Sequence, residues 1–281
     1  MVVLLIIAAT LFALQFLFNK TYKETQGKDL SSVWLFALLT NLVGFFLMLG
    51  LNGFSLQFSW FSLLIAAIAA ANGILYTYFS FKALDVVNLS VYSIFAMLGG
   101  MILPFLQGII FYGEKMTVPK VICCALIIVS LALTAEKGKF GKKAVLCYAA
   151  VFILNGMSGV LSKIHQSSPD LATSSENYMA LKCAVTVAVC LVWILAKYRK
   201  LPEIRVKPFT LAALFSVFNS VGNLLCLIAL TKLDASIQYP LITGGTMVFS
   251  TIICFFTKDK PNWKTILSTA IALAASILII L

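Results

Sequence analysis

Long apolar runs dominate this chain, and they constrain its fold more than any other feature. Ten stretches of about 17 to 26 residues carry very few charged side chains. They do not alternate polar and apolar residues as membrane-barrel strands do, so they predict helices. At a rise of about 1.5 Å per residue, such helices have the length needed to cross a bilayer. The predicted spans cover residues 2–18, 32–51, 60–81, 86–111, 118–134, 144–161, 178–196, 208–230, 235–256 and 263–281.

The composition excludes an ordinary water-soluble domain. Of the 281 residues, 61% are hydrophobic and only 11% are charged, and the mean hydropathy is +1.02. A soluble protein needs a charged surface, whereas lipid solvates an apolar exterior and requires the backbone to satisfy its own hydrogen bonds. We therefore predict an all-α membrane protein with ten transmembrane helices and the lipid bilayer as its partner.

The net charge of +11 does not indicate nucleic-acid binding, because the basic residues are scattered over short loops. Sixteen of the 21 lysines and arginines fall in the odd-numbered connections between spans, and five fall in the even-numbered connections or the adjoining span ends. Positive charge marks cytoplasmic loops. This bias predicts a multi-pass protein of the inner (plasma) membrane, with odd-numbered connections in the cytoplasm and both termini outside.

The two halves of the chain, residues 1–136 and 137–281, show a weak internal repeat. Matching features occur in the same order at offsets of 143 (Lys20 to Lys163) to 149 (Asp85 to Asp234) residues. The matched sets are Lys20 with Lys163, Leu84-Asp85 with Leu233-Asp234, Gly99-Gly100 with Gly244-Gly245, and Glu114-Lys115 with Asp259-Lys260. Because each half holds five spans, the second half must enter the membrane upside down. We therefore predict an inverted repeat, the architecture of many alternating-access carriers.

The Phe-Tyr-Gly-Glu-Lys run at 111–115 closes the fourth span. Together with ten short helices in two five-helix halves, it resembles the drug/metabolite transporter superfamily, and its EamA-type bacterial carriers in particular. The resemblance implies a secondary carrier whose cavity is built from helices 1–4 and 6–9, with helices 5 and 10 peripheral. Two features depart from the family pattern. Asp259 stands where a glutamate is common, and family members usually keep both termini in the cytoplasm.

Polar side chains recur at helical spacing on several spans, which places them on one face of each helix. Such residues are costly in lipid unless they face protein or water. Helix–helix hydrogen bonding explains single serines and threonines, but matched stripes on four spans favour a shared hydrated cavity. The predicted substrate-binding residues are Gln15, Asn19, Asn41, Asn72, Tyr76, Tyr92, Asn155, Ser158, Lys182, Asn219, Asn223 and Gln238.

Lys182 is the most informative of these residues. It lies about five residues inside its predicted span, a depth of roughly 7 Å. From there a lysine can extend its ammonium to the interface. The alternative is a fixed positive charge that attracts a carboxylate or phosphate. In the repeat, Lys182 occupies the position equivalent to Asn41. The family that this chain resembles commonly has an arginine at this position of a half.

We expect no enzyme activity, cofactor or metal. The single histidine, His165, has no cluster around it, the seven cysteines fall in apolar spans without a CxxC pair, and no P-loop occurs. The favoured function is export of amino acids or similar zwitterionic or anionic metabolites by alternating access. Alternatives are a carrier of phosphorylated or nucleotide-linked sugars, and a multidrug exporter. The latter is disfavoured because no span has a central Asp or Glu of the kind that small multidrug resistance proteins use. A homodimer is left open.

Overall fold

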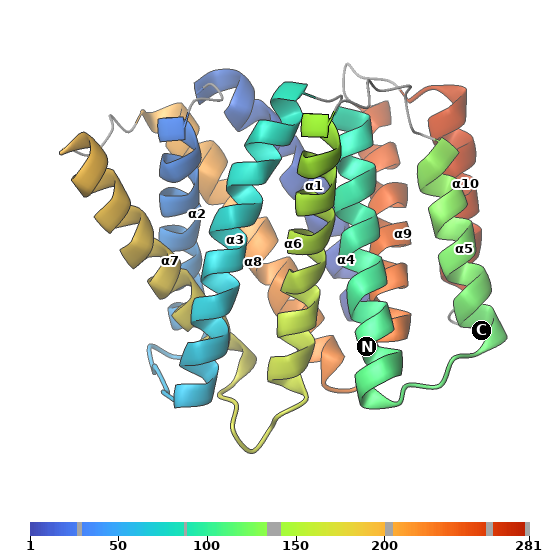
Figure 1. Ribbon diagram of the computed structural model, residues 1–281, viewed down its shortest axis with the longest axis horizontal. Coiled ribbons are helices and arrows are strands. Elements are labelled where there is room, and N and C mark those ends of the chain that lie inside the picture. The colour runs from blue at the N-terminus through green and yellow to red at the C-terminus, as the bar shows by residue number, and fades with distance from the viewer. Residues whose placement is uncertain (27–29, 87–88, 134–141, 200–204, 257–260, 279–281) are drawn as a thin grey trace.

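The computed structural model shows a bundle of ten helices that stand side by side (Figure 1). It describes all residues except 27–29, 87–88, 134–141, 200–204, 257–260 and 279–281. The helices are α1 (Val2–Gln26), α2 (Leu30–Leu51), α3 (Trp60–Val86), α4 (Leu89–Tyr112), α5 (Val118–Leu133), α6 (Lys142–Gln166), α7 (Ser175–Tyr198), α8 (Val206–Leu230), α9 (Ala235–Phe255) and α10 (Trp263–Leu278).

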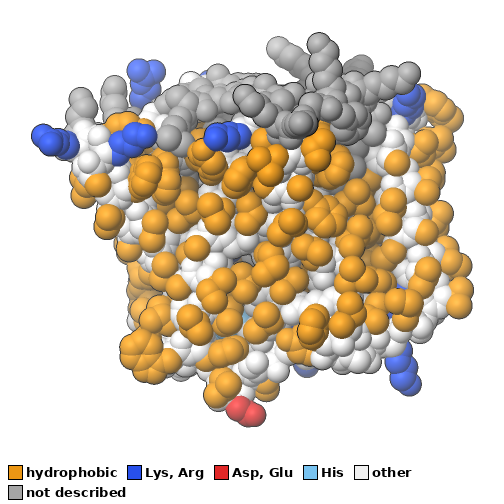
Figure 2. Space-filling view, viewed as in Figure 1, with side chains coloured by type: hydrophobic (Ala, Val, Ile, Leu, Met, Phe, Trp, Pro, Cys, Tyr) orange, Lys and Arg blue, Asp and Glu red, His pale blue; other side chains and the backbone are white. Residues whose placement is uncertain are grey.

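The all-α membrane fold predicted from the apolar runs is confirmed. Eight helices are long and apolar enough to cross a bilayer, and α5 and α10 are shorter apolar helices of 16 residues each. Sixteen residues of helix span about 24 Å, less than the roughly 30 Å of a typical hydrocarbon core. Hydrophobic side chains cover the side wall of the bundle, while lysines and arginines gather near its two ends (Figure 2).

Several helices extend beyond their predicted spans. α1 continues eight residues past Phe18 to Gln26, and α7 begins at Ser175 rather than 178. Ser174 caps α7 by accepting a hydrogen bond from the Asn177 backbone N–H. The predicted limits were too short here because hydropathy detects the lipid-embedded part of a helix, whereas polar turns outside lipid are equally helical.

Successive helices run in opposite directions, so the connections alternate between two ends of the bundle (Figure 1). We call the end where α1 meets α2 the odd end, and the end where α2 meets α3 the even end. The start of α1 and the last turn of α10 both lie at the even end. This arrangement matches the alternation that the charge pattern assumed.

Helices from the two halves of the chain pack mainly against each other. α1 packs on α8 and α9, and correspondingly α6 packs on α3 and α4. α2 contacts α7 and α8, and α7 contacts α2 and α3. α4 lies against α9, and α5 lies against α10. The two halves are therefore interleaved rather than separate bodies.

Two glycines that occupy equivalent positions in the predicted internal repeat lie where helices pack closely. A Cβ on Gly99 would lie 2.0 Å from the Phe152 carbonyl oxygen, so only glycine lets α4 approach α6 this closely. A Cβ on Gly244 would lie 2.2 Å from the Ser276 hydroxyl of α10. Both glycines thus permit tight packing of backbones, as small residues do in membrane helices.

Candidate functional site: a small polar cavity between apolar clusters

Four of the predicted substrate-binding residues meet in one small cavity between α2, α7 and α8. They are Asn41, Lys182, Asn219 and Asn223. Thr40, Met179, Cys183 and Ser220 complete the lining. The cavity has a volume of about 40 Å³, which holds about one or two water molecules. A metabolite therefore requires the surrounding helices to separate before it can occupy this space.

Lys182 is a charged group inside the bundle. It lies seven residues after the start of α7 at Ser175, about 10 Å along the helix axis. Its side chain lines the cavity together with the three asparagines. Among the residues that the structure describes, no carboxylate pairs with Lys182. An unpaired cation at this depth is energetically costly and is typical of a functional position.

The hydrogen bonds of two asparagines fix which of their atoms are free. Asn41 Nδ2 donates to the Ala37 carbonyl oxygen at 2.8 Å. Asn223 Nδ2 donates to the backbone oxygen and to Oδ1 of Asn219, at 2.7 and 3.0 Å. Because a carbonyl oxygen can only accept, the amide group that faces it must be the NH2 donor, and this determines the two amide orientations. The Oδ1 atoms of Asn41 and Asn223 thus remain as acceptors beside the donors of Lys182.

Apolar clusters flank the cavity toward both ends of the bundle. Toward the even end lies a cluster from α2, α3, α6, α7 and α8, which we call the even-side seal; it includes Met48, Leu161, Met179, Leu224 and Leu227. Toward the odd end lie two clusters, which we call the odd-side seal; they include Leu35, Phe36, Leu39, Cys190 and Ile194. The cavity consequently lies between apolar packing on both sides, with the four predicted residues that line it half-buried.

The remaining predicted site residues lie outside this cavity. Asn72 on α3 donates from Nδ2 to the Leu154 carbonyl oxygen at 2.9 Å, and Asn155 on α6 donates to the Ala96 carbonyl oxygen at 2.6 Å. Both asparagines thus join neighbouring helices. Tyr76 packs against a small apolar cluster that includes Ala83 and Val151. The half-buried Ser158 also lies on α6.

Three of the predicted site residues bury an amide oxygen that has no hydrogen-bond partner in the described part of the chain. They are Gln15 and Asn19 on α1 and Gln238 on α9. Gln238 Nε2 donates to the Cys226 carbonyl oxygen of α8 at 3.0 Å. Unsatisfied buried oxygens are uncommon and mark sites of water, ligand or rearrangement.

Some predicted positions fall outside the description. The side chains of Tyr92 and Lys20, and the whole of Asp259, lie beyond what the structure describes. Sequence reasoning did not select Thr40, Met179 and Cys183 as cavity residues. Met179 and Cys183 are not polar enough to stand out from an apolar run, so only the packing of three helices reveals them.

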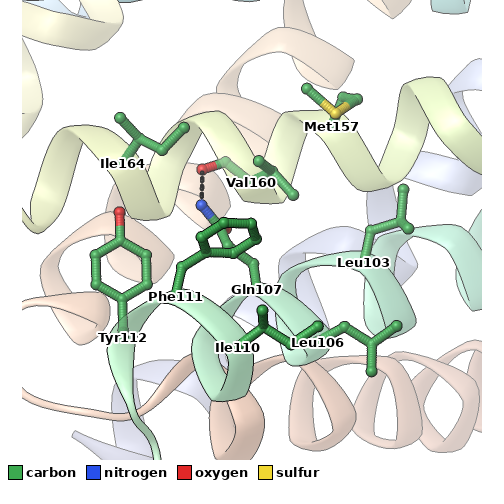
Figure 3. A pocket seen from close by; sticks show the side chains of 9 residues that line it. All are labelled: Leu103, Leu106, Gln107, Ile110, Phe111, Tyr112, Met157, Val160 and Ile164. Carbon is green, nitrogen blue, oxygen red and sulfur yellow. Dashed lines mark hydrogen bonds between the residues drawn. The ribbon is translucent and has the colours of Figure 1, made fainter.

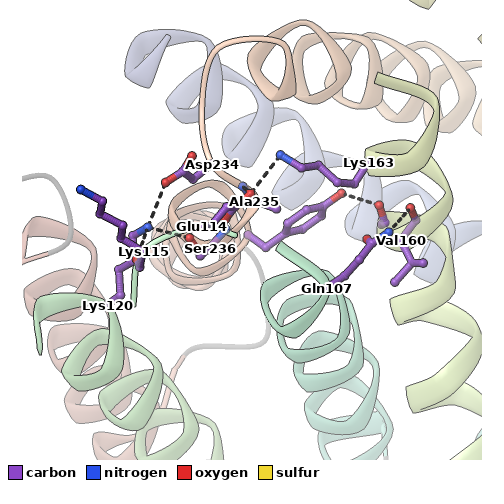
Figure 4. Close-up of polar contacts among 11 residues, drawn as sticks. Gln107, Glu114, Lys115, Lys120, Val160, Lys163, Asp234, Ala235 and Ser236 are labelled. Atoms are coloured by element: carbon purple, nitrogen blue, oxygen red, sulfur yellow. Dashed lines mark hydrogen bonds and ion pairs between the residues drawn. The ribbon is translucent and has the colours of Figure 1, made fainter. Parts of the chain in front are cut away.

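A second polar site lies at the even end and centres on Glu114 (Figure 4). The Glu114 carboxylate accepts hydrogen bonds from the backbone N–H groups of Ala235 and Ser236, both at 2.9 Å. It also pairs with Lys163 Nζ at 2.9 Å, and the two side chains are 4% and 10% exposed. We call these four residues the Glu114 clamp. Gly113 has a φ of 64°, a left-handed turn that brings Glu114 back over the bundle.

Glu114 also stabilises the start of α9 electrostatically, since anionic groups are favoured where a helix exposes its first N–H groups. Burial alone would raise the pKa of this carboxyl. The hydrogen bonds from Ser236, Lys163 and Ala235 outweigh it, and the pKa of Glu114 is lowered from its ordinary value. Glu114 is therefore ionised at neutral pH.

A neighbouring ion pair reinforces the same corner. Lys120 Nζ lies 3.0 Å from Asp234 Oδ2 and donates to the Ser236 hydroxyl at 2.8 Å. Lys120 also donates to the Lys115 carbonyl oxygen at 3.0 Å. The even-end charges thus form a network that joins α5, α6 and α9 to the loop after α4. Glu114 thus fixes the loop after α4 to α6 through Lys163.

A separate groove between α4 and α6 is apolar (Figure 3). It has a volume of about 440 Å³, and its lining includes the exposed side chains of Leu106, Ile110 and Phe111. Gln107 Nε2 donates to the Val160 carbonyl oxygen at 3.3 Å across its floor. The groove faces outward within the membrane-spanning wall, so lipid tails cover it. Among its described lining residues none is charged, and Gln107 is the one amide.

Comparison with known proteins supports the fold. No family model matches the sequence, and no curated protein matches it. A solved structure described as "Crystal structure of protein" superposes with a TM-score of 0.79 at 16% sequence identity. The match covers 98% of this chain and 94% of the other. At this identity the likeness shows a shared architecture: a multi-pass bundle of apolar helices.

Proposed function

We propose that the chain is a secondary transporter of small polar metabolites, with the Lys182 cavity as its substrate site. The observation that carries this proposal is an unpaired cation in a small polar cavity that lies between apolar clusters of the membrane-spanning bundle. A membrane protein retains such a charge where it binds or moves polar solutes. Seals on both sides are what a carrier needs to expose one site alternately to two compartments.

The cavity chemistry favours a zwitterion such as an amino acid. Lys182 offers N–H donors for a carboxylate, and Asn41 and Asn223 offer oxygens for an ammonium group. A phosphorylated or nucleotide-linked sugar would need several cations. Lys182 is the only charged residue among the described ones that line the cavity. A lipophilic cation would be repelled by Lys182, so multidrug export is disfavoured.

The packing of the helices supports membership in the drug/metabolite transporter superfamily, with an EamA-type carrier as the nearest resemblance. Exchanging the two halves converts the α1–α8 and α1–α9 contacts into the α6–α3 and α6–α4 contacts, which also exist. This correspondence is expected of two inverted five-helix repeats, residues 1–136 and 137–281. We further propose an inner-membrane orientation with the basic odd end in the cytoplasm and export toward the even end.

A matched ligand series tests the substrate class. The thermal stability of the purified protein in detergent is measured with an amino acid, the corresponding deaminated acid and the corresponding decarboxylated amine. A ligand that binds only the folded state stabilises it in proportion to its affinity. We expect the largest rise in melting temperature with an amino acid and none with the amine. The proposal would be contradicted if only amines raised the melting temperature. It would also be contradicted if none of the compounds taken up by proteoliposomes raised it.

A further inference from the structure

We propose that the Glu114 clamp holds the even-side seal closed, and that its release opens the cavity to the even end. This inference rests on the proposed transport function, because only in a transporter does such an opening release or admit a substrate. The clamp's contacts themselves are independent of any substrate. Glu114 belongs to the loop after α4, Lys163 to α6, and Ala235 and Ser236 to α9.

The clamp joins the two walls of the even-side seal. On one wall, Lys163 lies two residues after Leu161 on α6, and Leu161 belongs to the seal. On the other wall, α8 contributes Leu224 and Leu227 and connects through residues 231–234 directly to Ala235. Glu114 therefore ties the end of α6 to the junction of α8 and α9. Separating these walls breaks its contacts with Lys163 or with α9.

The clamp is suited to two discrete states. Its carboxylate and ammonium are both buried, and separating them leaves unpaired charges unless water enters. Moving Glu114 also frees the two N–H groups at the start of α9. Intermediate arrangements thus lose several interactions together, which favours a closed state and a hydrated open state over partial opening. Interfaces with two such packings are common switching elements.

Two native cysteines on α7 provide the test. Cys183 lines the cavity, and Cys190 is fully buried in the odd-side seal. Opening toward the even end exposes Cys183 to water but leaves Cys190 protected, whereas general loosening exposes both. The purified intact protein is treated with a charged methanethiosulfonate reagent, and the modification rate at each cysteine is measured by peptide mass spectrometry.

The test variants are Glu114→Gln and Lys163→Met. Lys163→Arg keeps the ion pair, and Lys232→Gln removes an exposed charge at the same end. We expect the two test variants to accelerate Cys183 modification by about tenfold or more, since an open minor state starts from about 0.1–10% occupancy. Both controls should react like wild type, and Cys190 should stay unreactive throughout.

Two results would overturn the inference: unchanged Cys183 reactivity in both test variants, or a parallel rise at Cys183 and Cys190. The labelling needs no substrate, so it does not depend on the proposed substrate class. Conversely, if the labelling contradicts the role of the Glu114 clamp, the ligand series remains a valid test of the transport proposal.

Discussion

Glu114 and Lys163 form a buried ion pair, with 2.9 Å between the carboxylate Oε1 and the ammonium Nζ, although α5 and most of α6 lie between them in sequence. The ring of Tyr112 lies 5.3 Å from the same ammonium. The pair joins the loop after α4 to α6, and Glu114 also holds the start of α9. The pair thus belongs to a set of contacts that joins the loop after α4, α6 and α9 at the even end.

Removing one member of this pair should destabilise the protein. Glu114→Gln or Lys163→Met leaves the partner charge buried and unpaired, a change that typically costs about 3–5 kcal/mol. Thermal melting in detergent with a thiol-reactive dye suits this protein, since its seven cysteines are thiols and four of them are buried. Lys232→Gln serves as the control. Equal melting temperatures for all variants would show that the pair contributes nothing.

The stability of the protein should also depend on pH, because the Glu114 carboxylate becomes protonated in acid. The pKa of this carboxyl is lowered from its ordinary value of 4.5. Its contribution is therefore fully present above the unfolded-state pKa and is lost as the pH falls through the lower folded-state pKa. Melting temperature measured from pH 8 down to pH 3 should lose this contribution only below about pH 4.5. In Glu114→Gln this pH-dependent part of the melting temperature should be missing. If the variant and the wild type had the same dependence of melting temperature on pH, Glu114 would not be its source.

Gly108 on α4 lies directly beneath the Glu114 carboxylate. A Cβ at this position would lie 2.5 Å from Glu114 Oε2. Gly108→Ala should therefore displace the carboxylate and destabilise the protein by about 1–3 kcal/mol, the usual range for overpacking. In a Glu114→Ala background the same change should cost much less. Additive effects on melting in this double-mutant cycle would contradict the contact.

Substitutions of two asparagines should distinguish a structural role from a substrate-binding role. Asn155→Leu removes the hydrogen bond to Ala96 and should lower stability by about 0.6–2 kcal/mol, with substrate affinity unchanged. Asn223→Leu removes a cavity acceptor and should weaken binding by about 1–3 kcal/mol. Melting curves with and without ligand measure both quantities. Loss of affinity in Asn155→Leu and not in Asn223→Leu would place the substrate elsewhere.

Much of the fold could be predicted from the sequence because lipid imposes one strong rule. Every apolar run long enough to span a bilayer must be a helix, and all ten runs are helices. The helix ends were less predictable. Residues 21–26 of α1 include the buried Tyr22, and residues 175–177 of α7 follow the Ser174 cap; hydropathy detects neither the packing nor the cap.

The candidate site was predictable only in part. Lys182 and Asn41 stood out because polar groups are rare in apolar spans, and the structure brings them together. Asn72 and Asn155 share the same helical spacing but hydrogen-bond to neighbouring backbones instead. Periodicity identifies the face that a residue occupies. It does not distinguish a helix contact from a cavity, because that depends on how three helices meet.

The most direct test of the account is binding and flux by Lys182 variants. Purified protein is titrated with the best-stabilising zwitterion, and proteoliposomes report its uptake, for wild type, Lys182→Met and Lys182→Arg. We predict that Lys182→Met lowers affinity roughly 10- to 150-fold, the loss of a charge-assisted hydrogen bond of about 1.5–3 kcal/mol, and abolishes flux at low concentration. Lys182→Arg should retain part of both. Wild-type affinity and flux in Lys182→Met would contradict the claim that this cavity binds the transported substrate.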